Sequence, residues 1–274
     1  MTGFKKRLAS TALATAMTLT ALPVSVFLIS TDAEAGVPNG FAYTQGTRFM
    51  LDGSPFYYAG TNCYYLTFKS QEAVDSVFKD AEAMGLKVIR VWGNLDVGVK
   101  TGTTDSEGKP VFTNNNDGPG EKDGIYFQYF DKDLGKPVIN EGKDGLQKLD
   151  YALYQAEKHG IKLLITFTNY WDAFGGMGQY VKWPEELGIT GLKKDDFYTN
   201  ETLKGWYKDY VNGLLNHTNQ YTGRKLKDEP SVFAWELANE PRCNTDAQCK
   251  DNILYNWAKE MSEYVKSVDP NHMV

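Results

Sequence analysis

One junction occurs twice in this chain, as Met84-Gly85-Leu86-Lys87-Val88-Ile89 and as His159-Gly160-Ile161-Lys162-Leu163-Leu164. In each copy a helical pattern ends at the glycine, and an apolar, strand-like run begins almost at once. Glycine readily adopts the left-handed backbone that ends a helix, so a short turn leads directly into the next strand. This repeated succession of helix, glycine and strand predicts an α/β fold.

Four apolar runs are the expected strands, at residues 56–60, 88–92, 163–168 and 232–238. They are continuous rather than alternating, which is typical of parallel strands buried on both faces. Between them, apolar residues recur at three- and four-residue steps, as on the buried face of a helix. The expected helices are centred on residues 74–81, 146–156, 203–214 and 254–265, and Ser70 is placed to cap the first.

The connections between these elements are unequal in length. Those from helix to strand are short, whereas residues 93–142 and 169–198 form long loops after the second and third strands. Long loops after the carboxyl ends of strands build the active site of a (β/α)₈ barrel, and a doubly wound sheet also binds its ligand there. No glycine-rich phosphate-binding motif follows any strand, so a nucleotide-binding sheet is disfavoured.

Residues 1–35 have the features of a secretory signal peptide. A basic start at residues 5–7 is followed by an apolar stretch over residues 8–29 and by Ala33-Glu34-Ala35, a small-x-small cleavage pattern. The alternative is a membrane anchor, which Pro23 and several hydroxyl residues in the apolar stretch argue against. We therefore expect a secreted, extracellular protein whose mature domain spans residues 36–274, and no later stretch is apolar enough to span a bilayer.

Composition narrows the classes of partner. The net charge of −6 argues against nucleic acid or an anionic membrane surface, because both require a basic face. Aromatic residues make up 14% of the chain. Such rings pack against the apolar faces of sugars, although an ordinary hydrophobic core accounts for many of them.

The cysteines and histidines point to no metal. Cys243 and Cys249 are close enough in sequence to close a small disulfide ring in an oxidising compartment. Cys63 is then left over, and a buried free thiol is expected there. The three histidines are scattered and lack ligand spacing with these thiols, so no metal site is predicted.

The chemistry is expected where the fourth strand ends, in Trp235-Glu236-Leu237-Ala238-Asn239-Glu240-Pro241. Proline cannot donate to a strand ladder and marks the end of the strand. A partly desolvated carboxyl group there suits the general acid that a retaining glycosidase needs to protonate its leaving group. The alternative is that Glu240 only forms an ion pair with Arg242 or caps the following turn.

The chain resembles the endo-β-1,4-mannanases of glycoside hydrolase family five, a group of retaining (β/α)₈ enzymes. The resemblance runs through the mature chain. It includes Gly60-Thr61-Asn62-Cys63-Tyr64-Tyr65, Ile89-Arg90-Val91-Trp92-Gly93 and Phe167-Thr168-Asn169-Tyr170-Trp171. It continues through Trp206-Tyr207-Lys208-Asp209-Tyr210 and Tyr221-Thr222-Gly223 and closes with Trp235-Glu236-Leu237-Ala238-Asn239-Glu240-Pro241-Arg242-Cys243. Asn-Glu-Pro alone indicates only the larger clan, whereas the longer run is more specific to mannanases.

The resemblance implies a role for each matching residue. Glu240 corresponds to the general acid/base and Asn239 to the residue that contacts the substrate 2-hydroxyl. Arg90 corresponds to the arginine that orients the nucleophilic carboxylate and keeps it ionised, with an ordinary ion pair as the alternative. Glu236 is expected in a hydrogen-bond network inside the barrel.

Rings near the same strand ends are the expected sugar contacts. Trp92 resembles a substrate-binding ring of the family, and core packing is its alternative. For Tyr64, Trp171 and the neighbouring Tyr170, packing in a wall or core is as good an interpretation as contact with sugar. The implied substrate is a β-mannan polysaccharide, bound by a monomer without any cofactor.

The family's nucleophile, a second Glu at the end of strand seven, has no counterpart here. After Glu240 the sequence offers only Glu260 and Glu263, and both fall in an expected helix. The sequence stops at residues 272–274, where a fifth strand should begin. We therefore expect a (β/α)₈ barrel truncated after about four βα units, inactive by itself.

Two other functions stay open from the sequence. An endo-β-1,4-glucanase of the same clan would share Arg90, Asn239 and Glu240. A non-catalytic carbohydrate-binding protein would need no nucleophile and fits if residue 274 is the true carboxyl terminus.

Overall fold

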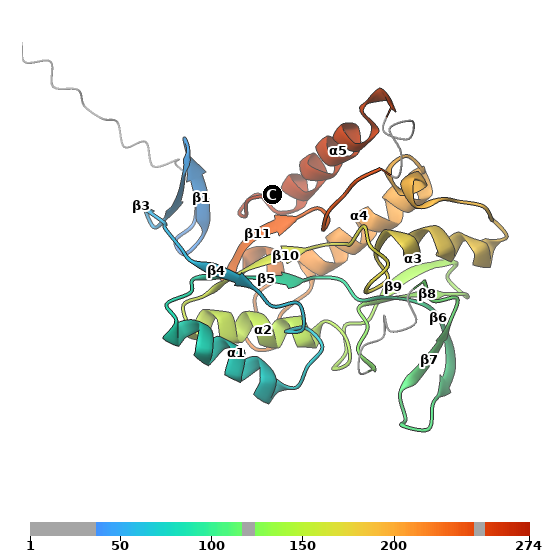
Figure 1. The fold of residues 1–274 in the computed structure, drawn as a ribbon, viewed down its shortest axis with the longest axis horizontal. Helices are drawn as coiled ribbons and strands as arrows, with labels where there is room; N and C mark the ends of the chain where they lie inside the picture. Colours follow the sequence, from blue (N-terminus) through green and yellow to red (C-terminus); the bar gives the residue numbers. More distant parts are fainter. Residues whose placement is uncertain (1–36, 117–123, 244–249) are drawn as a thin grey trace, which may run out of the picture. The chain divides into compact units, whose positions relative to one another are not determined.

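Four parallel strands form the central sheet of this computed structural model, which describes residues 37–116, 124–243 and 250–274. In spatial order they are β4 (Gly60–Asn62), β5 (Val88–Trp92), β10 (Lys162–Thr166) and β11 (Val232–Glu236). Their carboxyl ends therefore meet at one edge of the sheet (Figure 1). The predicted α/β fold with a parallel sheet is confirmed.

The four predicted helices are also present. They are α1 (Gln71–Ala83), α2 (Gln147–Lys158), α4 (Glu201–Asn216) and α5 (Ile253–Val268). Ser70 caps α1 as predicted, because its Oγ accepts from the Ala73 amide at 3.4 Å. In Figure 1, α1 and α2 lie below the sheet strands and α5 lies above them.

The repeated junction has the same hydrogen bonds in both copies. In the first, Leu86 N donates to Ala81 O and Gly85 N donates to Glu82 O, both at 2.9 Å. In the second, Ile161 N donates to Ala156 O at 2.9 Å and Gly160 N to Glu157 O at 3.2 Å. Both glycines have positive φ, 73° and 61°. These are Schellman motifs, and they confirm that glycine ends each helix next to a strand.

The first predicted strand is displaced along the chain. Residues 56–60 were expected to pair, but the strand is Gly60–Asn62, and pairing begins where Lys87 N donates to Ala59 O at 2.9 Å. The preceding aromatic residues pack instead of pairing: the rings of Phe56 and Tyr58 lie 6.0 and 5.2 Å from that of Phe233. The prediction of a strand at residues 56–60 is therefore wrong, because the aromatic side chains of this apolar run cover the end of the sheet.

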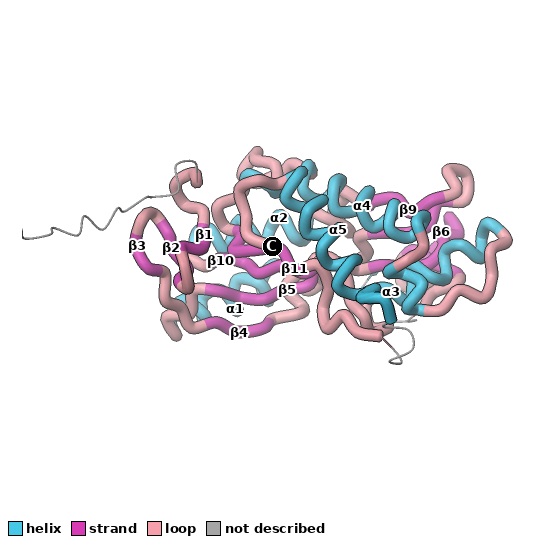
Figure 2. The backbone as a smooth tube through the Cα atoms, turned by 90° about the horizontal axis from the view of Figure 1, so that it is seen from above, coloured by secondary structure: helices cyan, strands magenta, loops and turns pink. Residues whose placement is uncertain are grey.

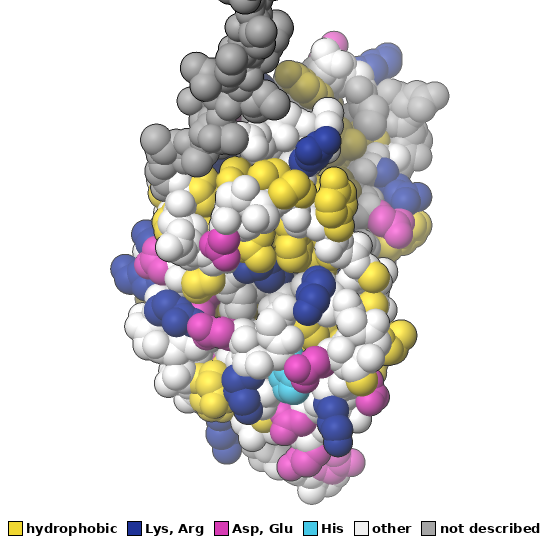
Figure 3. All heavy atoms as spheres, turned by 90° about the vertical axis from the view of Figure 1, so that its left-hand side faces the viewer, with side chains coloured by type: hydrophobic (Ala, Val, Ile, Leu, Met, Phe, Trp, Pro, Cys, Tyr) yellow, Lys and Arg dark blue, Asp and Glu magenta, His cyan; other side chains and the backbone are white. Residues whose placement is uncertain are grey.

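An antiparallel sheet that the sequence does not predict precedes the first parallel strand. It contains β1 (Ala42–Gln45), β2 (Arg48–Leu51) and β3 (Ser54–Pro55). Hydrophobic side chains gather in a band on the face of the molecule at this end (Figure 3). The ring of Phe49, in β2, lies 5.2 Å from that of Phe233.

The two segments expected as long loops contain regular structure. The first holds β6 (Asp96–Thr104), β7 (Pro110–Thr113), β8 (Gln128–Asp131) and β9 (Lys136–Ile139), which form one sheet. The second holds α3 (Gly176–Lys182). Figure 2 shows β6, β9 and α3 beyond one end of the parallel strands and β1, β2 and β3 beyond the other.

Short 3₁₀ helices complete the described secondary structure. They are η3 (Trp183–Leu187), η4 (Lys194–Tyr198), η5 (Leu226–Asp228) and η6 (Lys250–Asn252). At the end of the chain, Met273 forms a parallel bridge with Ala234, and Trp235 N donates to Met273 O at 3.0 Å. The last residues thus lie beside β11, as expected for the start of a next strand.

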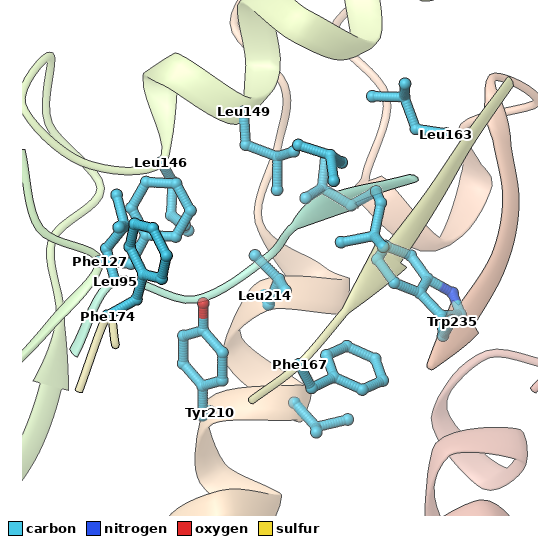
Figure 4. Close-up of a cluster of buried hydrophobic side chains, with 14 of the residues drawn as sticks. Leu95, Phe127, Leu146, Leu149, Leu163, Phe167, Phe174, Tyr210, Leu214 and Trp235 are labelled. Carbon is cyan, nitrogen blue, oxygen red and sulfur yellow. The ribbon is translucent and has the colours of Figure 1, made fainter. Parts of the chain in front are cut away.

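The hydrophobic core lies between the sheet and the helices (Figure 4). Phe167 and Trp235 stack with ring centroids 5.2 Å apart, and Leu149 and Leu214 meet the strands from α2 and α4. Trp235 also donates its Nε1–H to Asp269 Oδ2 at 2.7 Å. Burying side chains of this size, at roughly 1.5–3 kcal/mol each, holds the helices against the sheet.

The structure also bears on the cysteines and on the predicted leader. Cys63 is buried with a free thiol, as expected, and burial raises its pKa. The signal peptide at residues 1–35 and Cys249 of the expected Cys243–Cys249 disulfide lie outside the described residues. Within the described part of the chain, no helix has the length and hydropathy needed to cross a bilayer.

Candidate active site

A cleft of about 380 Å³ opens at the carboxyl-terminal edge of the parallel sheet. It is lined by Asn62, Tyr64, Arg90, Val91, Trp92, Phe174, Asn239 and Glu240. Five of the six residues predicted for the site therefore lie together. The sixth, Trp171, joins them by donating its Nε1–H to Glu240 Oε2 at 2.9 Å.

Strand register explains why residues so far apart in sequence meet here. Asn62, the last residue of β4, lies opposite Arg90 of β5. Beyond the ends of β10 and β11, Asn169 and Asn239 continue the parallel pairing, with Asn239 N donating to Thr168 O at 2.8 Å. Residues at or just beyond the ends of adjacent parallel strands share one edge, which is where a barrel presents its chemistry.

Arg90 is the centre of a hydrogen-bond network below the cleft. Its Nε donates to Glu236 Oε2 at 2.7 Å and its Nη2 to Asn239 Oδ1 at 3.0 Å. Asn239 in turn donates from Nδ2 to Asn169 Oδ1 at 2.9 Å. The amide of Asn239 is thus fixed on both its oxygen and its nitrogen side. Glu236 lies in the network as expected, and the carboxylate that Arg90 pairs with is Glu236.

Glu240 is more exposed than the sequence suggested. Its side chain is 53% exposed, and Arg242 Nη2 pairs with its Oε2 at 2.7 Å. The Glu240 carboxyl group is therefore less desolvated than expected, and the ion pair with Arg242, the alternative interpretation, is present. The exposure follows from the end of the strand, because Glu240 stands beyond β11 at the open rim of the cleft.

The backbone of Glu240 is unusual. Its φ is +47°, in the left-handed region that residues other than glycine rarely adopt. Such a conformation costs roughly 1–3 kcal/mol and persists only where the surroundings impose it, often at functional sites. Arg242 also lies 4.8 Å from the Trp171 ring, so the carboxylate, the guanidinium and the indole form one unit.

Aromatic rings form the walls of the cleft. The Trp92 and Tyr64 rings lie 5.7 and 6.1 Å from the ring of Phe174. Tyr64 and Trp171 are 55% and 45% exposed, which leaves much of each ring open to a ligand. Tyr170 is 3% exposed, so it packs in the wall, one of the two interpretations given above.

Three of the lining residues, Asn62, Val91 and Phe174, are not among the residues predicted for the site. Asn62 and Val91 lie in stretches that resemble the family. Because the first strand was expected at residues 56–60, Asn62 was not expected at a strand end. Phe174 precedes Gly175-Gly176, and only tertiary contacts bring its ring to the cleft. The Gly175-Gly176 pair after the third strand is the feature of the sequence that indicates a tight turn there.

Among the described residues, Glu240 is the carboxyl group that lines the cleft. Glu260 and Glu263 lie on α5, as expected, and pair with lysines. Hydrogen bonds from Lys204 and Lys208 lower the pKa of Glu260. Neither residue is placed to act as a nucleophile beside Glu240. The described part of the chain also holds no cluster of side chains suited to a metal.

The chain is similar to several known proteins. The family model described as GH family 5 beta-mannosidase-like matches residues 39–274. A probable mannan endo-1,4-beta-mannosidase F from Aspergillus oryzae is 42% identical over 235 residues, covering 85% of this chain and 43% of its own. A probable mannan endo-1,4-beta-mannosidase A from Aspergillus flavus is 39% identical, covering 88% and 53%.

Solved structures give the same result. The endo-1,4-beta-mannanase from Rhizomucor miehei matches with a TM-score of 0.69 and 38% identity, over 85% of this chain and 59% of its own. The endo-beta-1,4-mannanase from Thermotoga petrophila matches with a TM-score of 0.63 and 40% identity, over 79% and 41%. The chain spans about half the length of the curated relatives it matches. It belongs to the beta-mannosidase-like group of glycoside hydrolase family 5.

Proposed function

We propose that residues 36–274 form the amino-terminal half of the catalytic barrel of a secreted endo-β-1,4-mannanase. The observation that carries the proposal is the cleft, where Glu240 and Asn239 stand over Arg90 between the rings of Trp92, Tyr64 and Trp171. The relatives named as mannan endo-1,4-beta-mannosidases support mannan as the substrate.

The lining of the cleft suits a neutral polysaccharide. Exposed rings such as Tyr64 and Trp171 offer flat apolar surfaces to sugar faces. A few fixed polar groups then set orientation, as in most small-molecule sites. Asn239 is the best placed of these, because its two hydrogen bonds hold the amide still beside the proposed acid. We assign it the contact with the substrate 2-hydroxyl.

The proposed reaction is double displacement with retained anomeric configuration. Glu240 protonates the departing glycosidic oxygen as a second carboxylate attacks the anomeric carbon, and then takes a proton from the water that releases the sugar. Both contacts from Trp171 and Arg242 fall on Oε2. Oε1 is therefore the oxygen that we assign to proton transfer.

The second carboxylate must stand about 5–5.5 Å from Glu240 in a retaining enzyme. We propose that it comes from outside the described residues and that Arg90 orients it. Glu236 is engaged with Arg90, which makes it part of the support below the site. No cofactor is needed, because two carboxyl groups suffice.

The test is hydrolysis of unsubstituted mannan by the complete gene product and by its Glu240→Gln variant. Turnover should fall by about 10²–10⁴, the usual contribution of a general acid/base, with thermal unfolding unchanged. Glu260→Gln is the matched control, because Glu260 pairs with lysines on the outer helices and should retain activity. Near wild-type turnover by Glu240→Gln would overturn the assignment.

The same preparation separates the other functions. Faster hydrolysis of carboxymethylcellulose than of mannan would indicate a glucanase. Binding of mannan without hydrolysis by the wild-type protein would indicate a carbohydrate-binding protein. Proton NMR of the first product distinguishes retention from inversion.

A further inference from the structure

The buried carboxylate of Asp96 lies where two segments that build the cleft meet. Asp96 begins β6 and is 1% exposed. Its Oδ2 accepts from Gly176 N and from Asn94 Nδ2, both at 3.2 Å, and its Oδ1 accepts from Gln128 Nε2 at 2.8 Å. The carboxylate therefore ties the segment after β5 to the segment after β10.

The turn that Asp96 holds has an unusual backbone. Phe174, Gly175 and Gly176 have φ values of 65°, 82° and 55° in succession. Phe174 O accepts from Asp96 N at 3.0 Å and from Asn94 Nδ2 at 3.2 Å. A left-handed conformation at a phenylalanine persists only when surrounding contacts impose it.

The two segments also touch backbone to backbone. A Cβ added to Gly175 would lie 2.1 Å from Asp96 O, and one added to Gly176 would lie 2.2 Å from Asn169 O. No side chain fits in either place. The turn at residues 174–176 is thus pressed between Asp96 and the end of β10.

The ring of Phe174 connects this turn to the cleft. It lines the cleft and contacts the rings of Trp92, Tyr64 and Phe68, with centroids 5.7, 6.1 and 5.8 Å away. Figure 4 shows Phe174 grouped with Leu95 and Phe127 at one end of the hydrophobic core. The ring therefore lies between that core and the aromatic wall.

We propose that Asp96 is a positioning residue of the sugar cleft: it holds the turn at residues 174–176 and thereby sets the place of the Phe174 ring. Trp92 and Tyr64 rest on that ring, so the shape of the aromatic wall depends on a carboxylate that does not line the cleft. The inference rests on the proposed function of the cleft as a sugar site.

The test measures mannohexaose affinity by calorimetry in the complete gene product carrying Glu240→Gln, so that the ligand is not consumed. Asp96→Ala should weaken binding roughly three- to tenfold, the equivalent of one aromatic contact. Asp96→Asn should restore most of the loss, because its amide oxygen can accept from Gly176 while the Gln128 amide turns to accept from its nitrogen.

A double-mutant cycle separates positioning from general destabilisation. Phe174→Ala should weaken binding by a similar factor, and Asp96→Ala added to it should change little more, because both act through one ring. Asp150→Ala is the matched control. Asp150 is also fully buried and accepts from His217 and Gln220, but it lies outside the cleft, so the control should lose stability and keep its affinity.

Hydrogen exchange of the peptide covering residues 172–178 gives a readout independent of ligand. Faster exchange in Asp96→Ala than in Asp150→Ala supports the proposal, and equal exchange overturns it. Unchanged affinity in Asp96→Ala, or losses that simply add to those of Phe174→Ala, also overturn it. If no protein binds mannohexaose, the proposed function fails and exchange alone decides. Should Asp96→Ala not fold, Asn94→Ala takes its place.

Discussion

Each edge of the parallel sheet has a basic side chain and a group of aromatic rings, but these residues serve different purposes at the two edges. At the amino-terminal edge, Lys162 Nζ donates to Gly40 O and Pro230 O, each at 2.6 Å, and burial lowers its pKa. At the carboxyl-terminal edge, Arg90 donates to Glu236 and to Asn239, and Asn239 lines an open cleft. A cation thus joins backbone segments at one edge and orients functional groups at the other.

The rings differ in the same way. At the amino-terminal edge, Phe233 is 3% exposed and packs against Phe49, Phe56 and Tyr58. At the cleft, Tyr64 and Trp171 keep about half their surface exposed. Two residues that line the cleft, Phe174 and Glu240, also have a left-handed backbone. The amino-terminal edge is therefore closely packed, whereas the carboxyl-terminal edge keeps aromatic surface open in a cleft.

The largest expected effect is a dependence of stability on pH that originates at the cleft edge. Burial raises the pKa of Asp96 to about 7 despite the hydrogen bonds it accepts. The unfolded chain releases this proton near pH 4, so between pH 4 and 7 the folded state binds more protons and stability falls as pH rises. The fall is at most about 1.4 kcal/mol per pH unit, or about 4 kcal/mol in all.

Urea unfolding of the wild type and of Asp96→Asn from pH 4 to pH 8 measures this term. The variant has no proton to release and should lack the fall. Asp269 and the other carboxyl groups titrate in both proteins and cancel in the difference. Parallel curves for the two proteins would contradict the prediction.

At the amino-terminal edge, Phe233→Ala should cost about 3 kcal/mol of stability, the usual loss for a buried phenylalanine. Mannohexaose affinity should stay unchanged, because Phe233 packs at the far end of the strands from the cleft. Denaturant unfolding and calorimetry on the same samples check both halves. A loss of affinity would show that the two edges are coupled.

At the cleft, Arg90→Lys should lower mannan turnover by about tenfold or more while unfolding shifts only slightly. Lysine keeps the charge but lacks the fork that reaches Glu236 and Asn239 together. Steady-state kinetics with and without the substitution provide the measurement. Equal loss of stability and activity would make Arg90 a structural residue like Lys162.

The smallest expected effect is that of Trp171→Phe. A smaller aromatic ring remains for stacking, and the hydrogen bond from Nε1 to Glu240 Oε2 is lost. One such bond is worth about 1 kcal/mol, so turnover should fall roughly three- to fivefold. Trp171→Ala serves as the comparison, and it should fall further if the ring contacts sugar.

The periodicity of the sequence predicts the parallel sheet and the four outer helices well, because each buries an apolar stripe that its residues display in order. It fails where tertiary contacts decide. Phe56 and Tyr58 have the residue types of a strand, but their rings pack against Phe233. The sheet of β6 to β9 has no long apolar run from which it could be predicted.

The sequence predicts the residues of the candidate site that stand at strand ends, and it misses those that tertiary contacts bring to the cleft. Arg90, Trp92, Asn239 and Glu240 stand at strand ends, so order along the chain is enough to bring them together. Phe174 reaches the cleft through a turn held by Asp96, which lies far from it in sequence. The exposure of Glu240 depends on where Arg242 and Trp171 stand, and no pattern in the chain records that.

The paired Schellman turns have a consequence for what the strands can display. Because the amides of Leu86 and Ile161 are bonded back into their helices, neither strand can slide relative to the helix before it. Neighbouring residues of a strand face opposite sides, so a single inserted residue at Gly85 would turn Arg90 into the core and bring an aliphatic side chain to the polar network. An insertion after the carboxyl end of a strand, on the cleft side, would instead lengthen a loop and leave the facing of the strand residues unchanged.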